Sequence, residues 1–287
     1  MTSVLDLESS NNEIIKLITS EKPFIICRVS DNVTKLSLYY KIHNKIHTHF
    51  KNLSNTHDGI YSKNDRELIL YCNLYIQSII NMDLFACFPT LCNNTQNYII
   101  NHYNISKNSI IHNRSLEPFY QLQENIKPWS HYLLGKKVLV INPFVESFKK
   151  QLNAGFTIFK DKRIFLQGQE FVFYKSFQTI AGNHIHNNWY ETFTIMCKDI
   201  EKIEFDIALL GCGGYGLPLS NYIKTKLNKS AIYIGGGLQL LFGVMGKRWE
   251  NNPFWKKIIK DNHCKFIRPS KEERCKNSET IENGCYW

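Results

Sequence analysis

A glycine-rich turn between an apolar segment and a helical segment constrains the fold of this chain more than any other feature. Residues 205–210 have the composition of a buried strand, and residues 217–227 have the spacing of a helix. Between them lies the pattern Gly-x-Gly-x-x-Gly. In this context glycines allow a tight turn and let a phosphate group approach the backbone and the helix N-terminus. The turn therefore predicts a Rossmann-like unit. The glycines expected to bind phosphate are Gly211, Gly213, Gly214 and Gly216.

Two alternatives to this interpretation of the turn stay open. The glycines can serve only the close packing of a helix against the sheet. A Rossmann-type oxidoreductase is the other alternative, but a nicotinamide cofactor needs an acidic residue after the next strand to hold the ribose. That strand, residues 231–234, runs instead into Gly235-Gly236-Gly237. The sequence therefore disfavours a nicotinamide cofactor.

Short apolar runs alternate with helical segments along the chain, which is typical of a doubly wound, mostly parallel sheet. The expected strands are residues 24–29, 84–88 (ending at Pro89), 138–141, 170–174, 205–210 and 231–234. The expected helices are residues 11–20, 33–50, 65–81, 147–152, 189–202 and 217–227, and residues 51–64 are expected to form a polar loop. We predict an α/β fold with an N-terminal α/β part (1–134), a Rossmann-like nucleotide-binding part (135–250) and a C-terminal tail (251–287) that packs on the fold.

Polar residues and glycines follow several of these strands, at the edge where open parallel sheets bind ligands. Gly235, Gly236 and Gly237 follow one strand and give room for a ligand beside the first glycine turn. Their alternative role is to relieve backbone crowding. The polar residues expected at the same edge are Arg28, Asp31, Asn142 and Glu146, for which plain turns are the alternative.

The segment Gly246-Lys247-Arg248-Trp249 places two cations and an aromatic ring shortly after the three glycines. A fixed cation stabilises the negative charge that grows on a departing diphosphate. We therefore expect Lys247 to bind a donor phosphate and Arg248 to act in catalysis. A solvated basic turn is the alternative.

Composition disfavours several other classes of protein. No apolar run approaches the roughly 18 residues of a membrane span, and the first residues lack the layout of a signal peptide, so we expect a cytoplasmic protein. Nine cysteines, Cys92 among them, occur without a C-x-x-C pair and predict reduced thiols. The net charge is +10, but the lysines are spread out, which disfavours nucleic acid as a partner. His43 and His47 share a helical face, yet nothing nearby completes a metal site.

The segment from Phe205 to Trp249, with the closing Asn283-Gly284-Cys285-Tyr286-Trp287, resembles a group of uncharacterised proteins encoded beside surface-polysaccharide genes. The shared features are a Gly-Cys-Gly-x-Tyr-Gly turn, an Ile-Gly-Gly-x-x-Gln-Leu-Leu-Phe-Gly segment and Gly-Lys-Arg-Trp. The resemblance covers about a third of the chain and implies a role in polysaccharide biosynthesis.

The whole layout is similar to the GT-D type of glycosyltransferase fold, in which an early strand ends in Arg-x-Gly-Asp-Gly-Glu. In this chain Arg28 and Asp31 match that motif, whereas Val33 replaces the final Glu. The family's Asp-x-Glu pair is thought to hold a divalent ion and the donor diphosphate, so this replacement argues against a metal-dependent reaction.

The resemblance implies a glycosyltransferase that moves a sugar from a nucleoside-diphosphate sugar to a glycan or other acceptor. Asp31 or Glu146 would be the general base or a metal ligand. A non-catalytic sugar- or nucleotide-binding protein is the alternative left open by the missing Glu.

Overall fold

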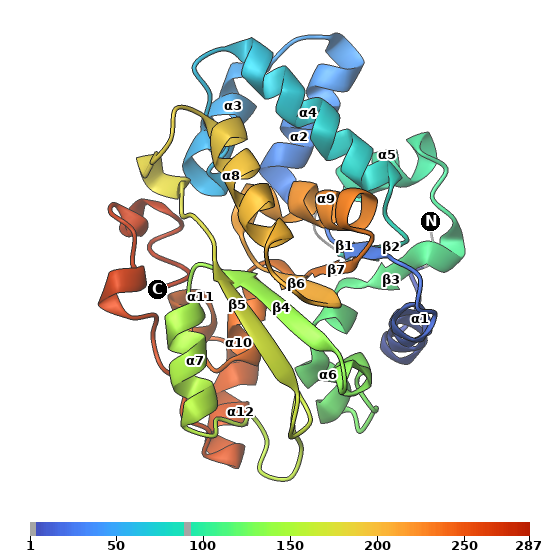
Figure 1. Cartoon of the computed structure of the whole chain (residues 1–287), viewed down its shortest axis with the longest axis vertical. Coiled ribbons are helices and arrows are strands. Elements are labelled where there is room, and N and C mark those ends of the chain that lie inside the picture. Colours follow the sequence, from blue (N-terminus) through green and yellow to red (C-terminus); the bar gives the residue numbers. More distant parts are fainter. Residues whose placement is uncertain (1–3, 89–92) are drawn as a thin grey trace.

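A seven-stranded sheet, in which all neighbouring strands are parallel, forms the centre of the computed structural model, which describes residues 4–88 and 93–287 (Figure 1). The strand order is β3-β2-β1-β7-β6-β4-β5. The bounds are β1 Ile25–Cys27, β2 Leu84–Cys87, β3 Ile110–His112, β4 Lys137–Asn142, β5 Glu170–Lys175, β6 Ile207–Leu210 and β7 Ser230–Tyr233. Pro89, the expected end of a strand, and Cys92 lie outside the described residues.

Helices cover both faces of this sheet, which confirms the predicted doubly wound α/β fold (Figure 1). One face carries α2 Asp31–His43, α4 Asp65–Ile80, α5 Asn93–His102, α8 Trp189–Glu201 and α9 Gly216–Leu227. The other face carries α1 Leu7–Thr19, α6 Pro118–Gln123, α7 Val145–Asn153, α10 Leu238–Leu241 and α12 Pro253–Asn262. The strands are apolar on both sides: Ile25 and Cys27 face the first layer, and Ile26 faces the second.

The sheet is continuous across the two parts expected from the sequence. Strand β1 pairs with β2 on one side and with β7 on the other, where Ile26 lies opposite Ile232. Residues 1–134 and 135–250 therefore share one sheet and the two hydrophobic layers that cover it.

The expected helix at residues 33–50 is two helices, and the expected loop at 51–64 is half helical. Helix α2 ends at Asn44, which has a left-handed backbone, and α3 runs from Thr48 to Asp58. Gly59, at φ +75°, ends α3 in the left-handed conformation that favours glycine. Helix α3 is polar and buries few side chains, so it lacks the apolar spacing that predicts a helix.

The C-terminal tail packs along α7 and against the segment that follows β4. Buried Glu273 accepts hydrogen bonds from the backbone N–H of Glu146 and from the hydroxyl of Ser147, so a tail carboxylate caps the N-terminus of α7. The side chain of Trp287 packs against Phe144, with ring centroids 6.0 Å apart. The tail is thus part of the folded unit.

Two further predictions concern membranes and cysteines. Among residues 4–88 and 93–287, no helix has both the length and the apolar character needed to cross a membrane. All eight described cysteines are free thiols.

Candidate functional site

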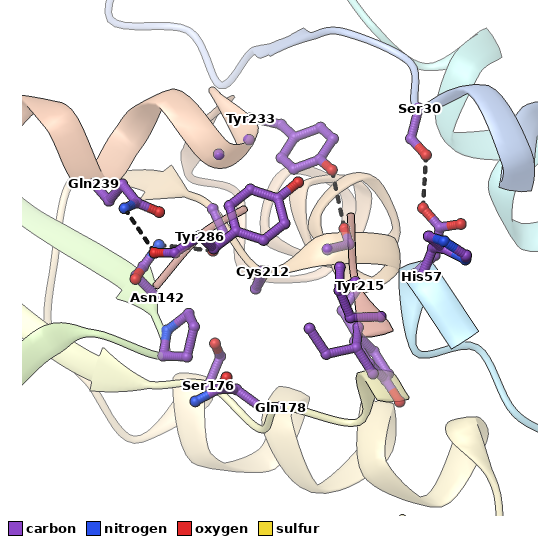
Figure 2. A pocket seen from close by; sticks show the side chains of 18 of the residues that line it. Ser30, His57, Asn142, Ser176, Gln178, Cys212, Tyr215, Tyr233, Gln239 and Tyr286 are labelled. Atoms are coloured by element: carbon purple, nitrogen blue, oxygen red, sulfur yellow. Dashed lines mark hydrogen bonds between the residues drawn. The ribbon is translucent and has the colours of Figure 1, made fainter. Parts of the chain in front are cut away.

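A cavity of about 570 Å³ opens at the carboxyl ends of the central strands (Figure 2). The segments that follow β1, β4, β5, β6 and β7 line it, together with the end of α3 and the C-terminal tail. Strands β4 and β6 are neighbours, but the chain leaves β4 toward β5 on one side and leaves β6 toward β7 on the other. This reversal of strand order is the place where open α/β sheets bind ligands.

The glycine-rich turn after β6 divides into a part that lines the cavity and a part that packs against protein. Gly211 and Gly213 line the cavity. The carbonyl of Gly211 accepts a hydrogen bond of 2.8 Å from the Asn142 side chain. Gly214 and Gly216 do not line it: a Cβ on Gly214 would lie 2.6 Å from Ile60, and one on Gly216 would overlap the ring of Tyr233. Close packing therefore accounts for these two glycines.

Gly216→Ala is expected to lower the free energy of unfolding by about 1–3 kcal/mol, because the added methyl group overlaps Tyr233 in a packed interior. Gly216 has helical backbone angles, so the substitution adds no backbone strain. Urea denaturation measures the change, and Lys226→Ala, on an exposed position of the same helix, is the control. An unchanged midpoint for Gly216→Ala would contradict this packing role.

Each of the three glycines after β7 accommodates a different side chain. Gly235, at φ +77°, lies beside the guanidinium of Arg28. A Cβ on Gly236 would lie 2.7 Å from the ring of Tyr286, and one on Gly237 would overlap the carboxyl of Glu117. Gly235 and Gly236 line the cavity, whereas Gly237 does not. The glycines therefore leave room for an arginine and a tyrosine from distant segments at the carboxyl end of β7.

Arg28 and Arg248 supply the positive charge of the cavity. The Arg28 guanidinium lies 4.5 Å from the centre of the Phe88 ring and has no hydrogen bond or ion pair with the residues that the structure describes. Arg248 is ion-paired with Glu282 and lies 4.8 Å from the ring centre of Tyr286. Lys247 lies outside the cavity lining, and its ammonium donates to the carbonyl of Asn283.

The two acids expected from the sequence have different surroundings. Asp31 lines the cavity in the first turn of α2 and pairs with Lys35 at 2.6 Å. Glu146 lies in the first turn of α7, with its carboxylate 2.8 Å from the ammonium of Lys149, and it does not line the cavity. Because α7 presents Glu146 to solvent, its carboxylate is not placed to contact a ligand in the cavity.

Asp58 is an acid of the cavity that the sequence analysis did not single out. It is the last residue of α3 and is 9% exposed. One carboxyl oxygen accepts a hydrogen bond of 2.8 Å from the hydroxyl of Ser30, and the other has no hydrogen-bond partner. Burial raises the pKa of Asp58 to about 6, against smaller opposing effects of Ser30, Asn32 and His57. The following Gly59, a common helix C-cap, was the signal in the sequence that α3 ends there.

Amide, hydroxyl and aromatic groups complete the lining. Figure 2 shows Asn142, Gln239 and Tyr286 on one side of the cavity and Ser30 with His57 on the other, with Ser176 and Gln178 below. Such groups hydrogen-bond sugar hydroxyls or a nucleobase and stack against a ring. Burial raises the pKa of the Cys212 thiol well above its usual range, so this cysteine is not a thiolate nucleophile.

Within the described parts of the chain, no group of three or more His, Cys, Asp or Glu side chains is placed to hold a metal ion. No protein-family model matches the chain, and no curated protein or solved structure matches it significantly.

Proposed function

We propose that this protein is a glycosyltransferase that takes a sugar from a nucleoside-diphosphate sugar. The observation that carries the proposal is the cavity at the reversal point of the sheet, where two arginines and glycine backbone lie opposite acidic side chains. Its volume of about 570 Å³ lies in the range of about 300–1,000 Å³ that is common for small-molecule sites.

The donor diphosphate is assigned to the side of the cavity that holds Arg28 and Arg248. The guanidinium of Arg28 lies over the ring of Phe88 and beside Gly235. Its N–H groups are available to donate hydrogen bonds to phosphate oxygens. As the bond between the sugar and the diphosphate breaks, negative charge grows on the leaving group. A cation fixed at that position stabilises the transition state more than the ground state.

Sugar and base are assigned to the neutral part of the lining. The amide of Gln178 and the rings of Tyr286 and Trp287 offer hydrogen bonds and aromatic faces. The Asn142 amide, in contrast, already bonds the Gly211 carbonyl and the Phe144 N–H and shapes the wall. The match of Arg28 and Asp31 to the strand-end motif of GT-D glycosyltransferases supports the assignment of the donor diphosphate to the side of Arg28.

A ligand screen tests the proposal. Melting temperatures are measured with UDP-, GDP- and dTDP-hexoses, with free nucleoside diphosphates and with NAD(H). A ligand that binds only the folded protein, at one hundred times its dissociation constant, adds about 2.7 kcal/mol of stability. We expect a shift with a sugar nucleotide, and release of nucleoside diphosphate when an acceptor is added. A shift with NAD(H) alone would contradict the proposal, and binding without turnover would favour the non-catalytic binding protein.

Turnover is expected to stay within about threefold after treatment with EDTA, because Mg²⁺ and Mn²⁺ require several oxygen ligands. Asp31 is ion-paired with Lys35, and Val33 stands where the related motif has its second acid. The measurement is the initial rate before and after chelation, with and without added Mn²⁺. Abolished activity that Mn²⁺ restores would contradict this prediction.

A further inference from the structure

We propose that Asp58 is the general base that accepts the proton of the acceptor hydroxyl. This inference rests on the proposed glycosyl transfer and goes beyond it, because it names the group that activates the acceptor. Asp58 takes the place of the two acids expected from the sequence, because Glu146 is turned to solvent and Asp31 is paired with Lys35.

The hydrogen bonds around Asp58 hold its carboxyl in a defined orientation. Ser30 is the N-cap residue of α2, yet its hydroxyl makes no capping hydrogen bond. It donates instead to one oxygen of Asp58. Ser30 itself is fixed, because its carbonyl accepts a hydrogen bond from the Thr34 hydroxyl, which also contacts the hydroxyl of Tyr75. The helix thus forgoes a side-chain cap while its N-cap residue positions a carboxylate.

The second oxygen of Asp58 has the property that a base needs. It is buried and has no partner at normal hydrogen-bond geometry, although a buried acceptor without a partner costs free energy; the nearby Asn32 side chain lowers the pKa of the carboxyl. Asp58 is also the last residue of α3, where the helix dipole opposes a negative charge. Asp58 thus occupies a position that is unfavourable for stability, and it lies on the wall of the cavity. A role in ligand chemistry explains this combination.

Charged and titratable groups surround Asp58 from four elements. His57 precedes it on α3, and Asp31 faces it from α2. Tyr71 and Tyr75 face it from α4, and Tyr233 faces it from the end of β7. Burial raises the pKa values of these tyrosines, so they stay neutral. The ionisation of Asp58 near pH 6 is therefore the one that sets the fraction of active base.

The proposed reaction is a direct displacement of the diphosphate by the acceptor oxygen at the anomeric carbon. The acceptor hydroxyl gives its proton to the Asp58 carboxylate while its oxygen bonds to the anomeric carbon of the donor sugar. The bond between that carbon and the diphosphate oxygen breaks, and the nucleoside diphosphate leaves with the electron pair near Arg28 and Arg248. Asp58 then returns its proton to solvent.

The test compares Asp58→Asn with Asp261→Asn, a matched change on the exposed side of α12. The probe is release of nucleoside diphosphate from the UDP-, GDP- or dTDP-hexose that raises the melting temperature most, assayed from pH 5 to pH 9. We expect Asp58→Asn to lower turnover at least about a hundredfold, in the range typical of a lost general base. We expect the melting shift caused by the donor to be unchanged, and Asp261→Asn to behave as the wild type.

The pH dependence gives an independent readout. Wild-type turnover is expected to fall below about pH 6, where Asp58 becomes protonated, and the residual turnover of Asp58→Asn should lack this acid limb. Because the pKa of folded Asp58 is raised, its favourable contribution to stability is present at low pH and is lost as pH rises through about 6. Asp58→Asn should therefore melt at a higher temperature than the wild type at pH 8 and at a similar temperature near pH 4.

The possible failures are distinguishable. If Asp58→Asn keeps its turnover within about threefold of the wild type, Asp58 is not the base, since a lost base costs about a hundredfold or more. The same conclusion holds if the rate of the variant still falls at low pH. Either result leaves the proposed glycosyl transfer standing. A wild type that turns over none of the sugar nucleotides contradicts the proposed function, and the base role falls with it.

Discussion

Arg248→Lys is expected to lower turnover by about a hundred- to a thousandfold, the usual cost of losing one fixed electrostatic contact to the transition state. The Arg248 guanidinium lies half-buried against Tyr286 and reaches both the Tyr286 hydroxyl and Glu282. A planar guanidinium can keep such contacts and still donate two parallel hydrogen bonds to phosphate. A lysine ammonium is a single point charge and cannot do both.

Donor binding should change less than turnover in this variant, because a positive charge remains in the cavity. The fold should also be retained, since ion pairs as exposed as Arg248 with Glu282 contribute about 0–1 kcal/mol to stability. Steady-state kinetics with a matched melting temperature measure the effect, and Arg163→Lys, on an exposed loop, is the control. Unchanged turnover would make Gly-Lys-Arg-Trp a structural turn and would favour the non-catalytic binding protein.

Trp287→Ala is expected to lower the free energy of unfolding by about 3–5 kcal/mol, the range for removing a large aromatic side chain from a core. The Trp287 ring is 8% exposed, and its indole N–H donates to the carbonyl of Glu273. The ring also packs edge-on against Phe144, which follows β4, and it lines the cavity. Its removal should therefore lower stability and widen the cavity together.

Urea denaturation measures the stability of the Trp287→Ala variant. Tyr190→Ala removes an aromatic ring that is half exposed on α8 and serves as the control, with an expected change of about 0.5 kcal/mol or less. If both variants lost the same small amount of stability, the tail would contribute little to the core around Phe144.

The sequence predicts most of the sheet because its strands are short apolar runs, and β4, β6 and β7 end close to Asn-Pro or glycine. Strand β3 is the exception: Ile110 and Ile111 are followed by His112, and three residues carry too little pattern. Helix α3 was missed for a related reason, since a polar helix at the edge of a protein has no apolar stripe to detect.

Apart from Arg248, the site was predictable where its residues follow strands. Arg28, Asp31 and Asn142, and several of the glycines, lie on the cavity because the carboxyl ends of parallel strands meet at one edge. Asp58 comes from the end of a helix and Tyr286 from the tail, and only the folded chain brings them there. Sequence alone does not distinguish a glycine that lines a cavity from a glycine that packs against a tyrosine ring, so the different roles of Gly213 and Gly216 could not be predicted.

The central position of β1 has a consequence for synthesis on the ribosome. One edge of β1 pairs with β2, which follows within the N-terminal part, but the other pairs with β7, where Ile25 lies opposite Ala231. Until β7 has emerged, that edge of Ile25–Cys27 is an unpaired apolar strand, the kind of surface that templates association between chains. The nascent chain therefore has to keep β1 protected until most of the protein has been made, and a chain interrupted between β3 and β4 would leave both fragments with an unpaired edge at the middle of the sheet.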